Sequence, residues 1–157
     1  MEHVISVLVE NRFGVLSHIS GMFSGRGFNI DSLAVGETVD PSISRMTIVV
    51  RGDDSTLEQI LKQLNRQVNV IKVQDLSSEK FIERELMLIK VATTAKNRSE
   101  ILEIADIFRS KVVDVQHGTL SLEAVGSSDK LAALLDLLKV YGIKEIVRTG
   151  RIGMARG

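Results

Sequence analysis

The residues best suited to bind a ligand lie close to the N-terminus, between an apolar run and the first helical pattern. Asn11 carries an amide that accepts hydrogen bonds through its oxygen and donates through its nitrogen. Gly14 stands at the expected start of a helix, where backbone N–H groups lack partners and the helix dipole favours an anion. Because glycine has no Cβ, a ligand can approach this backbone closely. The backbone donors at Gly14 suit a carboxylate, and the amide oxygen of Asn11 suits an ammonium group. Together they predict a site for a zwitterion.

A purely structural role accounts for the same two residues. Asn11 would then cap the turn, and Gly14 would only begin the helix. The spacing of these residues does not decide between the two interpretations.

Hydrophobic periodicity predicts the elements that position these residues. Residues 1–9 alternate as a strand with at least one buried face, and apolar residues then recur at helical spacing until Gly25 and Gly27. A hairpin, a second helix and a fourth strand follow. The hairpin is expected at residues 28–39 and 45–51 across Asp40 and Pro41, and the fourth strand at residues 68–73. Asp53, Asp54 and Ser55 are expected to cap the second helix, with Glu58 three residues after Ser55 as in a capping box. This order predicts a four-stranded antiparallel sheet with two helices on one face, in the ferredoxin-like manner.

The same order of elements recurs in the second half of the chain. A strand at 85–93 precedes a helix that begins near Asn97, with Glu100 three residues on. The repeat is completed by a hairpin at 111–116 and 119–125, a leucine-rich helix around 131–138, a left-handed Gly142 and a strand at 143–148. We therefore predict an α+β protein of two ferredoxin-like βαββαβ modules, residues 1–77 and 78–157. Modules this small are expected to be covered by each other or by another chain.

Composition excludes several classes of function. Twenty basic and twenty acidic residues give a net charge of zero, so there is no overall field to attract nucleic acid or an anionic membrane. Without cysteine there are no disulfides, no thiolate catalysis and no cysteine-bound metal. His3, His18 and His117 are scattered, so no metal site is expected. No apolar run is long enough to cross a membrane, and we expect a cytoplasmic protein.

Four stretches carry a family resemblance. They are ENRFGVLSHISGMFSGRGFNIDSL at 10–33, SRMTIVV at 44–50, RELMLIKV at 84–91 and IVRTGRIGMARG at 146–157. Over its whole length the chain resembles the small regulatory subunit of acetolactate synthase, with an N-terminal ACT domain at 1–77 and the C-terminal domain of that family at 78–157.

The resemblance implies a non-catalytic subunit that activates a separate catalytic subunit and confers feedback inhibition by valine in branched-chain amino acid biosynthesis. Thiamine diphosphate, Mg and FAD are then expected in the large catalytic subunit, and no cofactor in this chain. The resemblance also implies a homodimer formed through the ACT domains, with no nucleic acid or membrane partner.

The resemblance places the effector site between two chains. Asn11, Gly14, Val15 and Leu16 would come from one chain and Asn29 and Ile30 from the other, and the family pattern Asn-x-x-Gly-x-Leu-Ser is intact at residues 11–17. The N–H groups of residues 14–16 would hold the carboxylate, while the two asparagines orient the polar end. Ile30, Leu33 and Val35 would surround the effector side chain, although Leu33 and Val35 equally suit plain strand core.

Other functions fit the residues less well. An RNA-recognition module shares the topology but needs stacked aromatic residues, and this chain has five Phe and one Tyr. Acylphosphatases use a loop arginine and an asparagine, as Arg12 and Asn29 suggest, but the rest of their loop pattern is missing. The thiamine-diphosphate motif is absent. The main alternative is a free-standing ACT-domain amino-acid sensor that regulates another enzyme.

Overall fold

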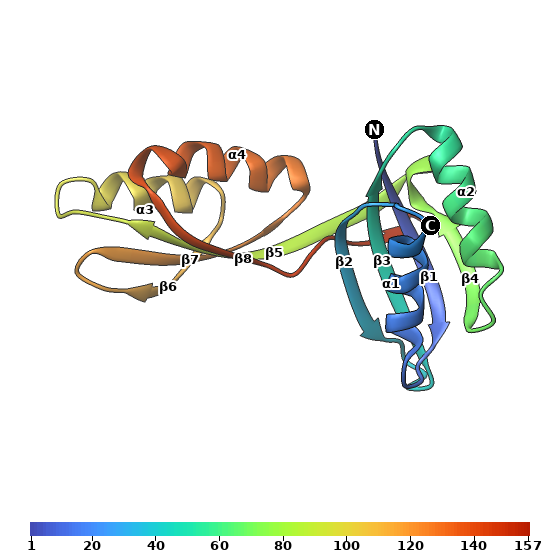
Figure 1. The fold of residues 1–157 in the computed structure, drawn as a ribbon. Helices are drawn as coiled ribbons and strands as arrows, with labels where there is room; N and C mark the ends of the chain where they lie inside the picture. The colour runs from blue at the N-terminus through green and yellow to red at the C-terminus, as the bar shows by residue number, and fades with distance from the viewer. The chain divides into compact units, whose positions relative to one another are not determined.

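The computed structural model describes all residues, 1–157, and divides into two units. Unit 1 comprises residues 1–82 and 151–157, and unit 2 comprises residues 83–150. Figure 1 shows that each unit is a sheet with two helices packed on one of its faces. Residues 151–157 lie with unit 1, whereas the division expected from the sequence assigned them to the C-terminal domain.

Unit 1 has the predicted βαββαβ order, and its sheet is antiparallel with strand order β2-β3-β1-β4. Its elements are β1 Glu2–Glu10, α1 Val15–Gly25, β2 Ile30–Glu37, β3 Ile43–Arg51, α2 Asp54–Asn65 and β4 Val70–Asp75. A short 3-10 turn, Leu76–Ser78, follows β4. The ferredoxin-like topology is therefore confirmed.

Both faces of β1 are buried. One face packs under α1 and α2 in a core that includes Ile5, Phe23 and Ile60, each at most 1% exposed. On the other face, Val4 and Val49 pack with Leu76. Phe81 and Ala155 lie against this second cluster, so the C-terminal residues help to close the face that the helices leave uncovered.

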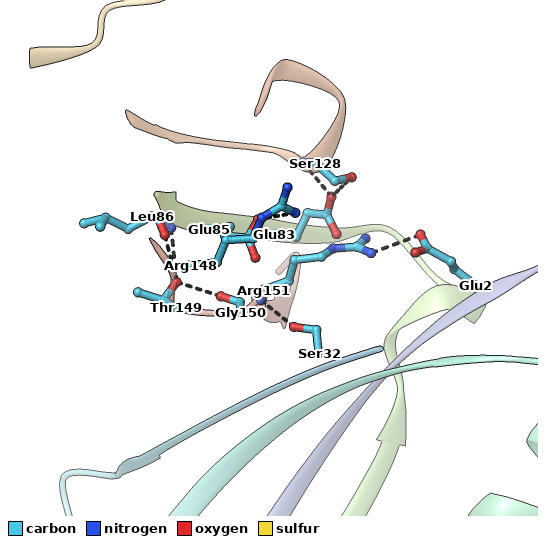
Figure 2. Close-up of polar contacts among 10 residues, drawn as sticks. All are labelled: Glu2, Ser32, Glu83, Glu85, Leu86, Ser128, Arg148, Thr149, Gly150 and Arg151. Atoms are coloured by element: carbon cyan, nitrogen blue, oxygen red, sulfur yellow. Dashed lines mark hydrogen bonds and ion pairs between the residues drawn. The ribbon is translucent and has the colours of Figure 1, made fainter. Parts of the chain in front are cut away.

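The strand β9, Ile152–Ala155, was not predicted from the sequence. It pairs with the start of β5 and donates from the Gly153 N–H to the Thr47 hydroxyl at 3.4 Å. Just before it, Arg151 donates its N–H to the Ser32 hydroxyl at 2.9 Å and pairs with Glu2 at 3.0 Å (Figure 2). These contacts attach the chain end to unit 1.

Unit 2 repeats the topology, with strand order β6-β7-β5-β8. Its elements are β5 Phe81–Ala92, whose first two residues belong to unit 1, α3 Arg98–Ile107, β6 Lys111–Val115, β7 Thr119–Gly126, α4 Ser128–Leu138 and β8 Ile143–Arg148. Its core joins Met87, Ile89 and Leu122 to the buried stripes of α3 and α4. The leucine spacing predicted this correctly, since Leu131, Leu134 and Leu138 are at most 2% exposed. At the end of the sheet, Thr149 accepts from the Leu86 N–H at 3.2 Å (Figure 2).

Two local predictions are wrong in detail, and a third is met only in position. Of the expected caps Asp53, Asp54 and Ser55, it is Asp53 that caps α2, accepting from the Thr56 N–H at 2.8 Å. The capping box of Ser55 and Glu58 does not form, because Ser55 lies inside the helix. Asn97 stands at the N-cap position of α3 as predicted, although its side chain makes no cap hydrogen bond. Gly142 has a positive φ of 98° but a ψ of 106°, outside the left-handed helical region, because it leads from a 3-10 turn directly into β8.

None of the helices combines the length and the apolar character that crossing a membrane requires.

Candidate functional site

The connection between β1 and α1 depends on a glycine. Gly14 immediately precedes α1 with φ of 85° and ψ of −9°, a left-handed conformation that costs other residues about 1–2 kcal/mol. A Cβ at this position would meet no atom within 4 Å. Backbone conformation rather than crowding therefore calls for glycine here, and the space beside it is open.

The first turn of α1 keeps unpaired donors. No side chain caps this helix, and its first turn contains no acidic residue. The Val15 N–H donates to the Arg12 carbonyl at 3.3 Å and the His18 N–H to the Gly14 carbonyl at 2.9 Å. The N–H groups of Gly14, Leu16 and Ser17 have no partner. These three donors, with the positive end of the helix dipole, suit a carboxylate.

Asn11 is held in place by the turn between β2 and β3. Its side-chain nitrogen donates to the Pro41 carbonyl and its backbone N–H to the Ser42 carbonyl, both at 2.8 Å. Ser42 in turn donates its hydroxyl and its N–H to Asp40, which lowers the pKa of that carboxyl group. With its nitrogen engaged, Asn11 keeps its side-chain oxygen to accept from an ammonium group.

Val15 contributes differently from its predicted role. Its side chain is only 4% exposed and belongs to the core of unit 1, and its N–H is already bonded to Arg12. Leu16, by contrast, is 46% exposed and keeps a free N–H. Among residues 14–16, the donors open to a ligand are therefore those of Gly14 and Leu16, and Ser17 extends the set.

Asn29 and Ile30 lie at the other end of α1. This helix has 11 residues and spans about 16 Å, so within one chain they are apart from Asn11 and Gly14. The Asn29 side-chain nitrogen donates to Asp31 at 2.8 Å. Ile30 is half-buried against the core of unit 1, as is Leu33, whereas Val35 is 45% exposed.

Asp31 is a candidate that sequence reasoning missed. Its two carboxylate oxygens accept separately from Asn29 and from the Arg51 guanidinium, which lies 2.6 Å away. Because Asp31 engages the side-chain nitrogen of Asn29, the side-chain oxygen of Asn29 stays open to accept a hydrogen bond. The carboxylate of Asp31 also adds a negative charge nearby. The available signal was the Asn-x-Asp spacing at a strand start, where side chains two residues apart point to the same side.

The strand that begins at this second group of residues is an edge strand. β2 pairs only with β3, so one side of its backbone has no partner strand. Eight residues with an open edge form a ready template for pairing with another chain.

Comparison with known proteins gives matches along nearly the whole chain. Residues 5–72 match a family described as "AHAS small subunit-like ACT domain", and residues 84–157 match one described as "Small subunit of acetolactate synthase". The chain is 50% identical over 157 residues to the "Probable acetolactate synthase small subunit" of Archaeoglobus fulgidus, covering 100% of this chain and 98% of the relative. It is 52% identical over 155 residues to the "Acetolactate synthase small subunit" of Mycolicibacterium smegmatis, covering 99% of this chain and 91% of the relative.

A solved structure agrees with these matches. The small subunit of acetolactate synthase from Thermotoga maritima is 41% identical and superposes with a TM-score of 0.89, covering 100% of this chain and 98% of that one.

Proposed function

The chain belongs to the family of acetolactate synthase small subunits, and from this premise we propose that it activates the catalytic subunit and makes it sensitive to valine. In this proposal the chain itself is non-catalytic and cytoplasmic. Thiamine diphosphate, Mg and FAD belong to the large catalytic subunit, and the chain holds no cofactor of its own.

The observation that carries the proposal is the set of open donors at the start of α1 beside the oxygen of Asn11. The free N–H groups of Leu16 and Ser17 match an amino acid's carboxylate. The Asn11 oxygen matches its ammonium group, because the bond to Pro41 keeps the amide nitrogen engaged. A free amino acid carries a carboxylate and an ammonium group on the same carbon, so it matches both parts of the site.

The second group of site residues requires a homodimer through the ACT domains. Because Asn29 and Ile30 lie at the far end of α1, one chain does not surround a ligand of amino-acid size. Antiparallel pairing of two β2 edges would bring Asn29 and Ile30 of the partner subunit toward Asn11 and Gly14. The open edge of β2 supports this arrangement.

The apolar residues available to the effector side chain favour an aliphatic amino acid. Ile30 and Leu33 are half-buried, and both pack against the core of unit 1. One methylene in such a pocket changes binding by about 1–3 kcal/mol, so valine, leucine and isoleucine are separated only modestly. An effector held between two chains binds one arrangement of the dimer more tightly than another, and this difference is the signal that reaches the catalytic subunit.

Thermal unfolding of the purified chain against all twenty amino acids tests the effector site. A ligand at about one hundred times its dissociation constant adds about 2.7 kcal/mol, which moves the midpoint by several degrees. We expect valine or a close relative to raise the midpoint and Asn11→Ala to abolish that rise. Asn65→Ala is the matched control, because Asn65 is also exposed and also donates to a backbone carbonyl, that of Leu61 at 3.0 Å.

The regulatory role is tested with the catalytic subunit itself. Adding the chain to that subunit should raise its acetolactate-forming rate, and valine should lower the rate only when the chain is present. If the chain binds valine but neither associates with the catalytic subunit nor changes its rate, it is a free-standing ACT-domain sensor.

A further inference from the structure

A basic groove lies between the end of α1 and the outer face of α2, in a cavity of about 410 Å³. Its lining includes three cations, two amides and one aromatic ring, namely Arg26, Lys62, Arg66, Gln59, Gln63 and Phe28. We refer to these six residues as the basic groove.

The three cations of the basic groove have no acidic partner. None of the ion pairs of the structure involves them, and no carboxylate lines the cavity. Unit 1 carries as many acidic as basic residues, so the groove is a local concentration of charge. Four lining residues, at 59, 62, 63 and 66, follow helical spacing and share one side of α2.

We propose that the basic groove docks an acidic surface of the acetolactate synthase catalytic subunit. This step rests on the proposed function, because it requires that the chain associates with that subunit. Exposed cations are well solvated and hold a single small anion weakly. Several of them on one face match a carboxylate-bearing protein surface, where they steer association and set the register.

The chemistry of the lining fits carboxylates. The two arginines present planar forks of N–H donors that pair with carboxylates in two parallel hydrogen bonds, and Lys62 adds a point charge. Gln59 and Gln63 can bond to the polar groups that surround such carboxylates. Phe28 offers an apolar contact at the same site.

The basic groove is also continuous with the proposed effector site. Phe28 lines the groove, and the next two residues along the chain are Asn29 and Ile30. Asn29 in turn bonds to Asp31 at the start of β2. A partner seated in the groove therefore contacts the segment whose conformation the effector would bias.

The test is the binding of the full-length chain to the purified catalytic subunit, measured as association and dissociation rates at about 0.05 M and about 0.3 M salt. The variants are Lys62→Glu and Arg66→Glu, singly and together. Lys144→Glu on β8 is the matched control for each single variant, because Lys144 is exposed, has no ion pair and gives the same change in net charge as either of them. Thermal midpoints with and without valine verify that each variant is folded and binds its effector.

We expect the double variant to bind roughly tenfold or more weakly, mainly through slower association, and to lose much of the salt dependence of the wild-type chain. Lys144→Glu should bind like wild type, and all variants should keep the valine-induced midpoint shift.

Three results would overturn the docking surface. If wild type binds and the double variant binds equally well with the same salt dependence, the groove is not the docking surface, while the proposed function stands. If inorganic pyrophosphate raises the midpoint of wild type but not of the double variant, and both bind the catalytic subunit equally, the groove is a small-anion site. Failure of wild type itself to bind the catalytic subunit would refute the proposed function, and the docking surface with it.

Discussion

The two units join their first strand and first helix through different loops. In unit 1, the loop reaches α1 through the left-handed Gly14, whose N–H has no partner. In unit 2, the side-chain oxygen of Asn97 accepts from the Thr94 N–H at 2.7 Å and from the Thr93 hydroxyl at 3.0 Å. The same topology therefore has an open glycine loop before its first helix in one unit and a loop closed by its own hydrogen bonds in the other.

The second faces of the two sheets differ as well. In unit 1 this face is covered where Val4 and Val49 pack with Leu76 and Phe81. In unit 2 the cross-strand neighbours Leu88 and Val147 remain 42% and 53% exposed. The difference indicates that a repeated fold does not imply a repeated role, because loops and uncovered faces vary independently of the order of strands.

Truncation of a large core side chain in unit 1 tests whether the two units fold separately. Phe23→Ala should destabilise unit 1 by about 3–5 kcal/mol, because Phe23 is 1% exposed and packs edge to face against Phe28. Hydrogen exchange should speed up in residues 1–82 and stay unchanged in residues 83–150. Phe13→Ala is the control, since Phe13 is fully exposed and its truncation should leave the free energy of unfolding almost unchanged. Equal loss of protection in both units would contradict their independence.

Gly14→Ala tests what opens the loop of unit 1. The positive φ should make this change destabilising by about 1–2 kcal/mol, and the valine-induced midpoint shift should shrink. Gly21→Ala, in the middle of α1 with no atom within 4 Å of the new methyl group, should instead stabilise by about 0.5–1 kcal/mol. Thermal unfolding measures both. If Gly14→Ala is as harmless as Gly21→Ala, the left-handed conformation is not what requires glycine.

Asn97→Ala tests the closed loop of unit 2. Removing the two hydrogen bonds that the Asn97 side chain accepts should lower the free energy of unfolding by about 1 kcal/mol. The valine-induced midpoint shift should be unchanged, in contrast to that of Asn11→Ala. Loss of the shift on Asn97→Ala would mean that unit 2 also takes part in effector binding.

The second helices of the two units should differ slightly in their sensitivity to acid. The Thr56 N–H and hydroxyl stabilise the charged form of Asp53 and hold its pKa below the ordinary value of 3.8. Because the folded pKa is lowered, the stabilisation is present above about pH 4 and is lost as the pH falls through the folded value. The cap of α4 is the neutral Ser127, which has no such dependence.

Hydrogen exchange at the start of α2 and α4 between about pH 5 and pH 2.5, compared after correction for intrinsic rates, measures this difference. Asp53→Asn is the control, because asparagine caps helices as well as aspartate does but does not titrate in this range. If α2 opens with acid equally in this variant, Asp53 is not the group responsible.

Long periodic patterns predicted the elements well. The spacing of Leu57, Ile60 and Leu64 predicted the buried face of α2, and all three are at most 9% exposed. The exact cap was not predictable, because Asp53 and Ser55 both suit an N-cap and lie two residues apart. β9 escaped prediction because four residues that include a glycine carry no periodic signal, and their pairing depends on strands distant in sequence.

The candidate site was only partly predictable. Asn11 and Gly14 stood out because their residue types have special hydrogen-bonding and backbone properties. Which backbone donors are free depended on the bond from Val15 to Arg12, which no spacing reveals. Asp31 and the cations of the basic groove looked like ordinary surface charges until the fold placed them beside their neighbours.

The fold class, the repeated topology and the family could be inferred from residue order, because hydrophobic periodicity, turn residues and local motifs are encoded by neighbours along the chain. The unpaired polar groups, the edge strand and the packing of residues 151–157 became apparent in the folded chain. Hydrogen-bond pairing and burial depend on residues that are far apart in sequence and adjacent only after folding.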